Sequence, residues 1–229
     1  AHWWMALASE TGGSYTVDEP ALIKLYLQLS PGDRGLIIAD TLGIEQKTGL
    51  LGEKIIGYVA IDKKADLIKI AIHEFCGAKL GVMVPNSAMR QFSAGQPWVY
   101  KGDAGTYAHD IEAQAYDANY VYCVTWGKLV PVEWRWLAAY WSEGFARVSA
   151  RWLDKSGVTP TGLNVTKLLE ALDAIGDGPP PNPVDPPPPM PDPPRPPIDP
   201  PSPSPADVVV IDPANKVITA PRGWMVKTS

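Results

Sequence analysis

The fold is inferred first from residues 108–127, which read Ala-His-Asp-Ile-Glu-Ala-Gln-Ala-Tyr-Asp-Ala-Asn-Tyr-Val-Tyr-Cys-Val-Thr-Trp-Gly. β-Branched and aromatic residues predict two short strands here, His109 to Tyr116 and Tyr120 to Thr125, joined by an Asp-Ala-Asn turn. His109 opens the first strand, and a Trp-Gly pair follows the second. Because strands joined by so short a turn pair antiparallel, this stretch predicts the centre of an antiparallel sheet.

Helical and strand patterns continue on both sides of this hairpin as far as residue 176. Apolar residues at helical spacing predict helices, and β-branched runs predict strands. The predicted helices cover 2–10, 16–29, 36–42, 62–75, 86–94, 133–140 and 165–175, and the further strands cover 54–61, 79–85, 129–132 and 144–149. Gly43 is the predicted stop of the third helix. Helices first and antiparallel strands later are typical of an α+β domain.

The first helix is apolar or aromatic on nearly all sides, with Trp3, Trp4 and Leu7 at its centre. Such a helix is predicted to be buried all round rather than amphipathic, with His2 in the core. No cap, initiator Met or signal peptide precedes it. We therefore expect that the numbered chain begins inside an element whose first residues are missing or were removed.

The composition of the 229 residues favours a globular protein and argues against two classes of partner. Hydrophobic residues make up 45% and charged residues 20%, which is ordinary for a packed core. A net charge of −5 without a basic run argues against nucleic acid, and no apolar run is long enough to span a membrane. Two cysteines cannot form a disulfide scaffold; Cys76 and Cys123 are expected as buried thiols, and a bridge between them stays open.

A proline-rich arm separates this domain, residues 1–176, from the C-terminus. From Pro179 to Pro205, 17 of 27 residues are proline. Such a segment, taken as residues 177–206, cannot build a core and is predicted to be a polyproline II arm that spans about 80 Å if straight. It is expected to act as a semi-rigid spacer, with a role as an adaptor-binding ligand as the alternative.

Residues 207–229 are predicted to form a β-hairpin followed by an apolar tail. Two β-branched runs, 208–211 and 217–220, flank a turn that contains Asp212-Pro213. A lone hairpin of this length is marginal in water, so it is expected to anchor the chain to its own domain, a second copy or another protein. The residues expected to make these contacts are Val208, Val210, Val217, Ile218 and Trp224.

Several sequence motifs occur in the order in which papain-like proteins carry them. A papain-like enzyme places its histidine at the start of one strand and an Asn before Ser-Trp-Gly on the next; here His109 and residues 124–127 (Val-Thr-Trp-Gly) occupy these places. Residues 52–62, 72–82 and 134–146 supply further matches. Over residues 2 to 176 the chain resembles the papain-like-fold proteins of tailed bacteriophages and prophages. The resemblance implies a helical half and an antiparallel β-barrel half.

The resemblance implies a catalytic set that is largely missing from this chain. The nucleophilic cysteine would lie about five residues before Ala1, and neither Cys76 nor Cys123 takes its place. His109 matches the general base, but Tyr107-Ala108 replaces the usual Gly-Gly before it. The orienting Asn is Val124, which cannot hydrogen-bond an imidazole. No metal-ligand spacing is present, and no cofactor is expected.

Two hypotheses about function follow from the sequence. The first is a structural or accessory protein of a phage or phage-like particle, such as a decoration or fibre-type component. Its domain would have a catalytically degenerate papain-like fold. It would be made in the bacterial cytoplasm and incorporated in the virion, where its arm and hairpin would join it to other virion proteins or to copies of itself. The alternative is an active cysteine peptidase or amidase with His109 as base and a nucleophile upstream of Ala1.

Overall fold

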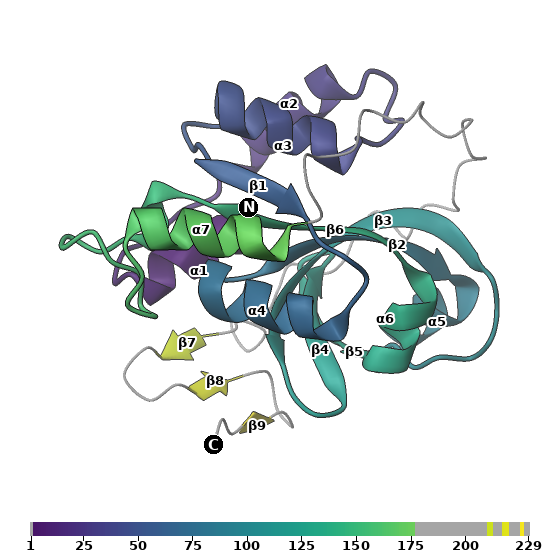
Figure 1. The fold of residues 1–229 in the computed structure, drawn as a ribbon. Helices are drawn as coiled ribbons and strands as arrows, with labels where there is room; N and C mark the ends of the chain where they lie inside the picture. The colour runs from purple at the N-terminus through teal and green to yellow at the C-terminus, as the bar shows by residue number, and fades with distance from the viewer. Residues whose placement is uncertain (1, 177–209, 213–216, 220–224, 227–229) are drawn as a thin grey trace.

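The computed structural model describes residues 2–176, 210–212, 217–219 and 225–226 (Figure 1). The helices are α1 (His2–Glu10), α2 (Glu19–Leu29), α3 (Ile38–Lys47), α4 (Ala65–Phe75), α5 (Asn86–Ser93), α6 (Trp134–Tyr140) and α7 (Val165–Ile175), with a 3₁₀ turn at Ala150–Trp152. The strands of the main sheet are β1 (Gly57–Ala60), β2 (Ala78–Pro85), β3 (Gly105–Tyr116), β4 (Tyr120–Thr125), β5 (Lys128–Glu133) and β6 (Trp141–Val148). The prediction of an α+β domain is therefore confirmed.

The main sheet is six-stranded and antiparallel, in the order β1-β6-β2-β3-β4-β5. It is an open sheet, so the prediction of a closed β-barrel half is wrong. Within the described residues β1 and β5 are the two ends of the sheet and do not pair with each other. On the outer side of β5, Trp98 forms an isolated bridge to Val132, with its N–H donating to the carbonyl of Pro131 at 2.9 Å. This loop therefore occupies the edge that a barrel would close.

The two faces of the sheet carry different side chains around the middle of β3. In the register of β2 with β3, Val82 lies opposite His109 and Gly81 lies opposite Asp110. Because alternate residues of a strand point to opposite faces, His109 shares a face with Ile111, and Asp110 shares the other with Glu112. We call these the histidine face and the carboxylate face.

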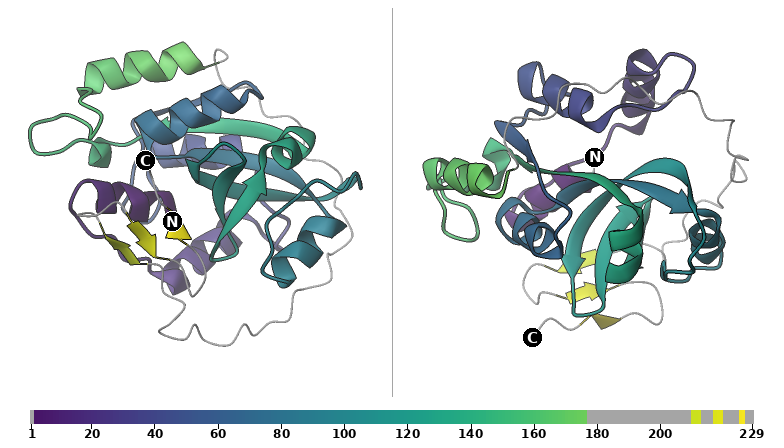
Figure 2. Two further views of the ribbon diagram at one scale, coloured as in Figure 1. Left: turned by 90° about the horizontal axis from the view of Figure 1, so that it is seen from below. Right: turned by 45° about the vertical axis from the view of Figure 1, so that its right-hand side comes forward.

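Helices cover both sides of the sheet. In Figure 1, α4 and α7 lie in front of the strands, and the left panel of Figure 2 places α1 on the opposite side. The buried hydrophobic residues form one core that includes alternate side chains of β2 and β3, residues of β6 and the inner faces of α1, α4 and α7. No helix among the described residues is long and apolar enough to cross a membrane.

Helix α1 buries one face only, so the expectation of burial all round is wrong. Trp3, Trp4 and Leu7 are buried, whereas Met5 is 44% exposed and His2 is also exposed. The buried indoles are fixed by hydrogen bonds at 3.0 Å, from Trp3 Nε1 to the carbonyl of Phe75 and from Trp4 Nε1 to Glu45 Oε1. The helix lies at the surface of the domain, and only the face toward the sheet and α3 has partners to pack against.

Helix α3 runs past Gly43 to Lys47, whereas Gly43 was predicted to end it. Gly43 does not adopt the left-handed conformation that ends helices. Gly49 adopts this left-handed conformation, with φ +80°. It follows Thr48, the last residue whose N–H donates to a helix carbonyl in the regular pattern, that of Ile44. The helix therefore ends at the first glycine that supplies the left-handed turn.

A buried ion pair joins β3 and β6 beneath α1. Arg147 donates to Glu112 at 2.6 Å, both side chains are about nine-tenths buried, and the guanidinium lies 4.3 Å from the ring centre of Trp3. A Cβ at Gly77 would lie 2.8 Å from Glu112 Oε1, and Gly77 also has φ +146°, so only glycine fits beside the carboxylate. The pair therefore depends on close packing from α1, β2, β3 and β6.

The C-terminal strands form a second, three-stranded antiparallel sheet from β7 (Val210–Asp212), β8 (Val217–Thr219) and β9 (Met225–Val226). Ile211 pairs with Ile218 and Thr219 with Met225. Of the residues expected to contact partners, Val210, Val217 and Ile218 lie in these strands. Val208, Trp224 and the proline-rich arm lie outside the described residues.

Removing one member of the buried ion pair is expected to destabilise the domain strongly. Arg147→Ala leaves the Glu112 carboxylate buried without its partner, which should lower the free energy of unfolding by about 3–5 kcal/mol. Urea unfolding followed by circular dichroism measures this change. Arg34→Ala, at an exposed arginine, is the control and should stay within about 0.5 kcal/mol of the parent. Equal stabilities of the two variants would contradict a structural role for the pair.

Candidate functional site

The candidate site is built around His109, which is half-buried on β3. Its Nε2 lies 2.6 Å from the hydroxyl oxygen of Thr125 at the end of β4. Its ring stacks on the indole of Trp126, with ring centres 4.1 Å apart and planes inclined by 16°. The imidazole is therefore held at one nitrogen and covered on one face.

The turn between β4 and β5 places Trp126 over His109. Thr125 pairs with Lys128, so Trp126 and Gly127 form a two-residue connection, and both have positive φ, 43° and 71°. Such turns match the twist of a hairpin, but a side chain other than glycine costs about 1–2 kcal/mol in this conformation. Trp126 recovers part of this through the stack on His109 and an edge contact with Phe92 at 4.9 Å.

Burial lowers the pKa of His109 to about 4. The carboxylate of Asp110 raises this pKa, and the nearby charge of Lys79 lowers it by a smaller amount. The imidazole is therefore neutral at pH 7. A neutral ring has one donor and one acceptor nitrogen, so the bond to Thr125 can run in either direction according to the tautomer. Nδ1 has no hydrogen-bond partner among the described residues. The geometry leaves this nitrogen available, but on a base that is weak at neutral pH.

Thr125, which the sequence analysis did not single out, orients the ring in place of the expected position Val124. Val124 pairs with Glu112 and with Leu129. It therefore lies on the carboxylate face, while Thr125, buried and one residue on, lies on the histidine face. Strand alternation indicates that Thr125 and Val124 point to opposite faces, but only the register of β3 with β4 shows that Thr125 shares a face with His109.

Helix α1 begins on the carboxylate face rather than beside His109. Trp3 in its first turn packs on Arg147, the partner of Glu112. Glu112 lies three positions after His109 on the regular part of β3, so their side chains point to opposite faces. The described turns of this helix therefore lie beside Glu112, on the other side of the sheet from the imidazole.

The two cysteines are unbridged; Cys123 is buried, as expected, whereas Cys76 is half-buried. Cys76 caps the C-terminus of α4 in a left-handed conformation, and burial raises the pKa of its thiol to about 12. Cys123 is fully buried opposite Ala113, and burial raises its pKa well above the usual range. The thiolate is the reactive form, so neither side chain is poised as a nucleophile.

The two other histidines are exposed, and they lie outside the site. His73 is exposed and bonded to Glu74, with 2.9 Å between Nδ1 and Oε1. His2 is exposed too, so the expectation that it lies in the core is wrong. Among the described residues no three His, Cys, Asp or Glu side chains gather as a metal site would require.

No family model, curated protein or solved structure matches the chain.

The imidazole of His109 is expected to stay neutral in the folded protein until the pH approaches 4, because burial disfavours its charged form. Below pH 6.5 the unfolded chain binds a proton at this residue and the folded chain does not, so stability should fall by up to about 3 kcal/mol between pH 6.5 and 4. An NMR titration of the ring measures the pKa directly. Trp126→Ala, which uncovers the ring, should move it toward 6.5, and a midpoint near 6.5 in the parent would contradict the prediction.

Both cysteines are expected to resist alkylation in the folded protein, because Cys123 is buried, Cys76 is half-buried and both thiols are protonated. Iodoacetamide at pH 8 should modify neither in native buffer and both in 6 M guanidinium, as read by intact mass. Introducing an exposed thiol as Ser156→Cys provides the control for reagent activity. Rapid native modification of Cys123 would show that the strand pair around it opens easily.

Proposed function

We propose that the chain is a structural or accessory component of a phage or phage-like particle, built on a catalytically degenerate papain-like fold. In this proposal residues 2–176 form the body of the component. The arm and the C-terminal strands join it to other virion proteins or to copies of itself. The protein would be made in the bacterial cytoplasm and end in the virion.

The single observation that carries the proposal is the placement of His109 relative to α1 and to the thiols. The imidazole is neutral, stacked under Trp126 and directed to the face opposite the start of α1. Cysteine peptidases need a thiolate beside the base, commonly at a helix N-terminus. Neither described cysteine meets this need, which supports a role in structure rather than in hydrolysis.

The C-terminal strands support an anchoring role. They comprise three, three and two residues, which is short for a sheet that must be stable by itself in water. Short strands gain stability when they extend the sheet of a partner. The proline-rich arm before them suits a spacer that carries them away from the domain.

A cysteine peptidase or amidase is the second candidate, and one observation favours it. Thr125 holds Nε2 of His109, and Nδ1 has no partner among the described residues, as a base facing a nucleophile would require. That nucleophile would have to come from before Ala1.

The first experiment tests the anchoring in the intact system. Particles produced with the full chain should retain it through a density gradient, whereas particles produced with Val217→Asp and Ile218→Asp should lose most of it, because charged side chains prevent strand addition. Mass spectrometry of the gradient fraction measures the amount retained. Ile23→Asp, at an exposed isoleucine on α2, is the matched control and should be retained. Absence of the parent chain from particles would reject the proposal.

The second experiment separates the two candidates. A thiol-directed activity probe applied to the complete gene product should label nothing that depends on His109. Labelling that disappears in His109→Ala, while the circular dichroism spectrum stays unchanged, would establish the peptidase or amidase instead.

A further inference from the structure

The edge of the main sheet at β1 is open within the described residues. β1 pairs only with β6, whereas the opposite edge, at β5, is covered by the loop of Trp98. The N–H of Ile61 donates to the carbonyl of Gly144, so every second residue of β1 directs its backbone groups toward β6. The N–H and C=O groups of Tyr58 and Ala60 therefore point outward, and no described residue hydrogen-bonds them.

Helices cover both faces of β1, so only its edge is left to a partner. Figure 1 shows β1 between α3 and α7. On one face the hydroxyl of Tyr58 donates to the carbonyl of Ala39 on α3 at 3.4 Å, and on the other face Leu172 of α7 lies against Gly57. An edge strand of this kind is a template for one more strand, because its main-chain groups supply the hydrogen bonds.

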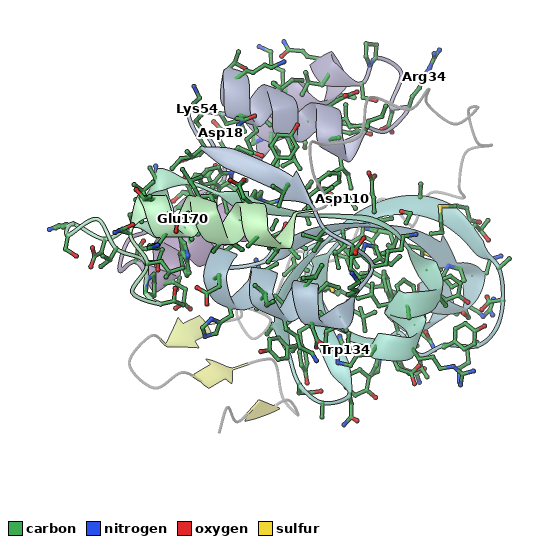
Figure 3. All side chains as sticks on the ribbon, viewed as in Figure 1. Asp18, Arg34, Lys54, Asp110, Trp134 and Glu170 are labelled. Carbon is green, nitrogen blue, oxygen red and sulfur yellow. The ribbon has the colours of Figure 1, made fainter. Side chains whose placement is uncertain are left out.

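A hollow of about 630 Å³ lies at the start of this edge, lined by Gln46, Lys47, Lys54, Ile55, Ile56 and Ala150. Ile56 is 37% exposed, and the amide of Gln46 donates to its carbonyl at 3.1 Å. Lys54 lies just before the start of β1 (Figure 3), and neither lysine of the hollow has an ion-pair partner among the described residues. Glu53, next to Lys54, is paired with Arg151 instead. An added strand would therefore find a pocket for an apolar side chain and two ammonium groups for a carboxylate.

The chain itself carries a strand that suits this edge. β7 is an end strand of the second sheet, so its outer edge is also open among the described residues. Residues 207–212 read Asp-Val-Val-Val-Ile-Asp, a β-branched run with an acid at each end. β9, the other end strand, is followed by Lys227 instead. The composition therefore favours β7 as the strand that meets the two lysines.

The proline-rich arm makes a second copy, rather than the same chain, the donor of this strand. The arm begins beside the acceptor, because a Cβ on Gly176 would lie 2.9 Å from the Cβ of Val59 on β1. To bring β7 back to that edge, residues 177–209 would have to double back. The 17 prolines among residues 179–205 oppose such a turn, since proline-rich chains are stiff. Extended, residues 177–209 can span about 110 Å, which exceeds the diameter of about 40 Å expected for a domain of this size.

We propose that β7 of a second copy adds to the open edge of β1. The added strand takes its hydrogen bonds from the backbone groups of Tyr58 and Ala60, and one end of it lies over the hollow at Lys47 and Lys54. Each copy then has one donor and one acceptor, so the contact is head-to-tail and builds a ring or an open row of copies. The inference rests on the anchoring role proposed above for the C-terminal strands, and it names the partner and the surface that they reach.

Disulfide trapping between two differently tagged full chains tests the proposal. One chain carries Ile56→Cys at the hollow, and the other carries a cysteine in place of Val210, Ile211 or Asp212 in turn, so that three registers are sampled. Because each chain has one new thiol, and the native cysteines are the same in every mixture, the mixed dimer reports contact between copies. At least one pair should form it about tenfold faster than the same donor mixed with a chain carrying Ser156→Cys, at an exposed site before α7, since docking holds the two sulfurs together.

A proline in the acceptor strand tests the use of the edge directly. Ala60→Pro removes an N–H that the added strand would use, and it should lower the rate of the Ile56→Cys mixture to that of the Ser156→Cys control. Proline is tolerated on an edge strand where its N–H would face outward, and circular dichroism checks the fold. Ala60→Ser keeps the N–H and should leave the rate unchanged. Equal rates for the two variants would overturn addition at this edge.

Two further outcomes would overturn the proposal. Mixed dimers that form no faster with Ile56→Cys than with Ser156→Cys, in all three registers, would exclude the β1 edge as the acceptor. A chain that carries both cysteines and closes on itself, seen as a faster-migrating monomer on a non-reducing gel, would show that the donor is the same chain.

The particle experiment above is independent of this test. Retention on particles that depends on Val217 and Ile218, without cross-links at β1, would reject this inference and leave the proposed function standing. Cross-links at β1 without retention on particles would support the inference and reject the role in a particle.

Discussion

The ion pair between Glu112 and Arg147 is the constraint on which the arrangement of layers depends. Both charges are buried, so their desolvation is offset only while the 2.6 Å contact is kept and Trp3 covers the guanidinium. Glu112 Oε1 and Arg147 Nε have no other partner among the described residues. A shift of α1 would admit water to the pair, and any side chain at position 77 would displace the carboxylate. The helix is therefore fixed to the carboxylate face by charge as well as by packing.

That fixation determines what the histidine can do. Because α1 packs on the carboxylate face, its described turns lie beside Glu112 and Arg147 and not beside His109. His109 is surrounded instead by Thr125, Trp126 and apolar neighbours, which favour its neutral form. The order of motifs along a sequence does not by itself bring side chains together, because a one-residue difference in strand register moves a side chain across the sheet.

Local patterns in the sequence predicted most helices and strands. The features that they did not predict depend on contacts between elements that are distant in the sequence. The strand from Tyr120 to Thr125 and the helix from Val165 to Ile175 have the predicted bounds, because alternation and helical spacing are local. Closure of the sheet depends on whether β1 meets β5, which no local pattern encodes. The bond between His109 and Thr125 depends on a register across two strands, and the one-sided burial of α1 depends on where α3 lies.

The stack of His109 on Trp126 accounts for the neutral state of this half-buried imidazole. Desolvation makes the histidine costly when charged, and the left-handed backbone makes Trp126 costly in its turn. The stack stabilises both side chains. The neutral imidazole packs under the indole, and the indole shields it from the water that would solvate its charged form. Thr125 then meets the remaining hydrogen-bond demand at Nε2. His109 thus joins β3 to the β4–β5 turn as an element of packing, and its chemistry as a base is suppressed by the contacts that hold it.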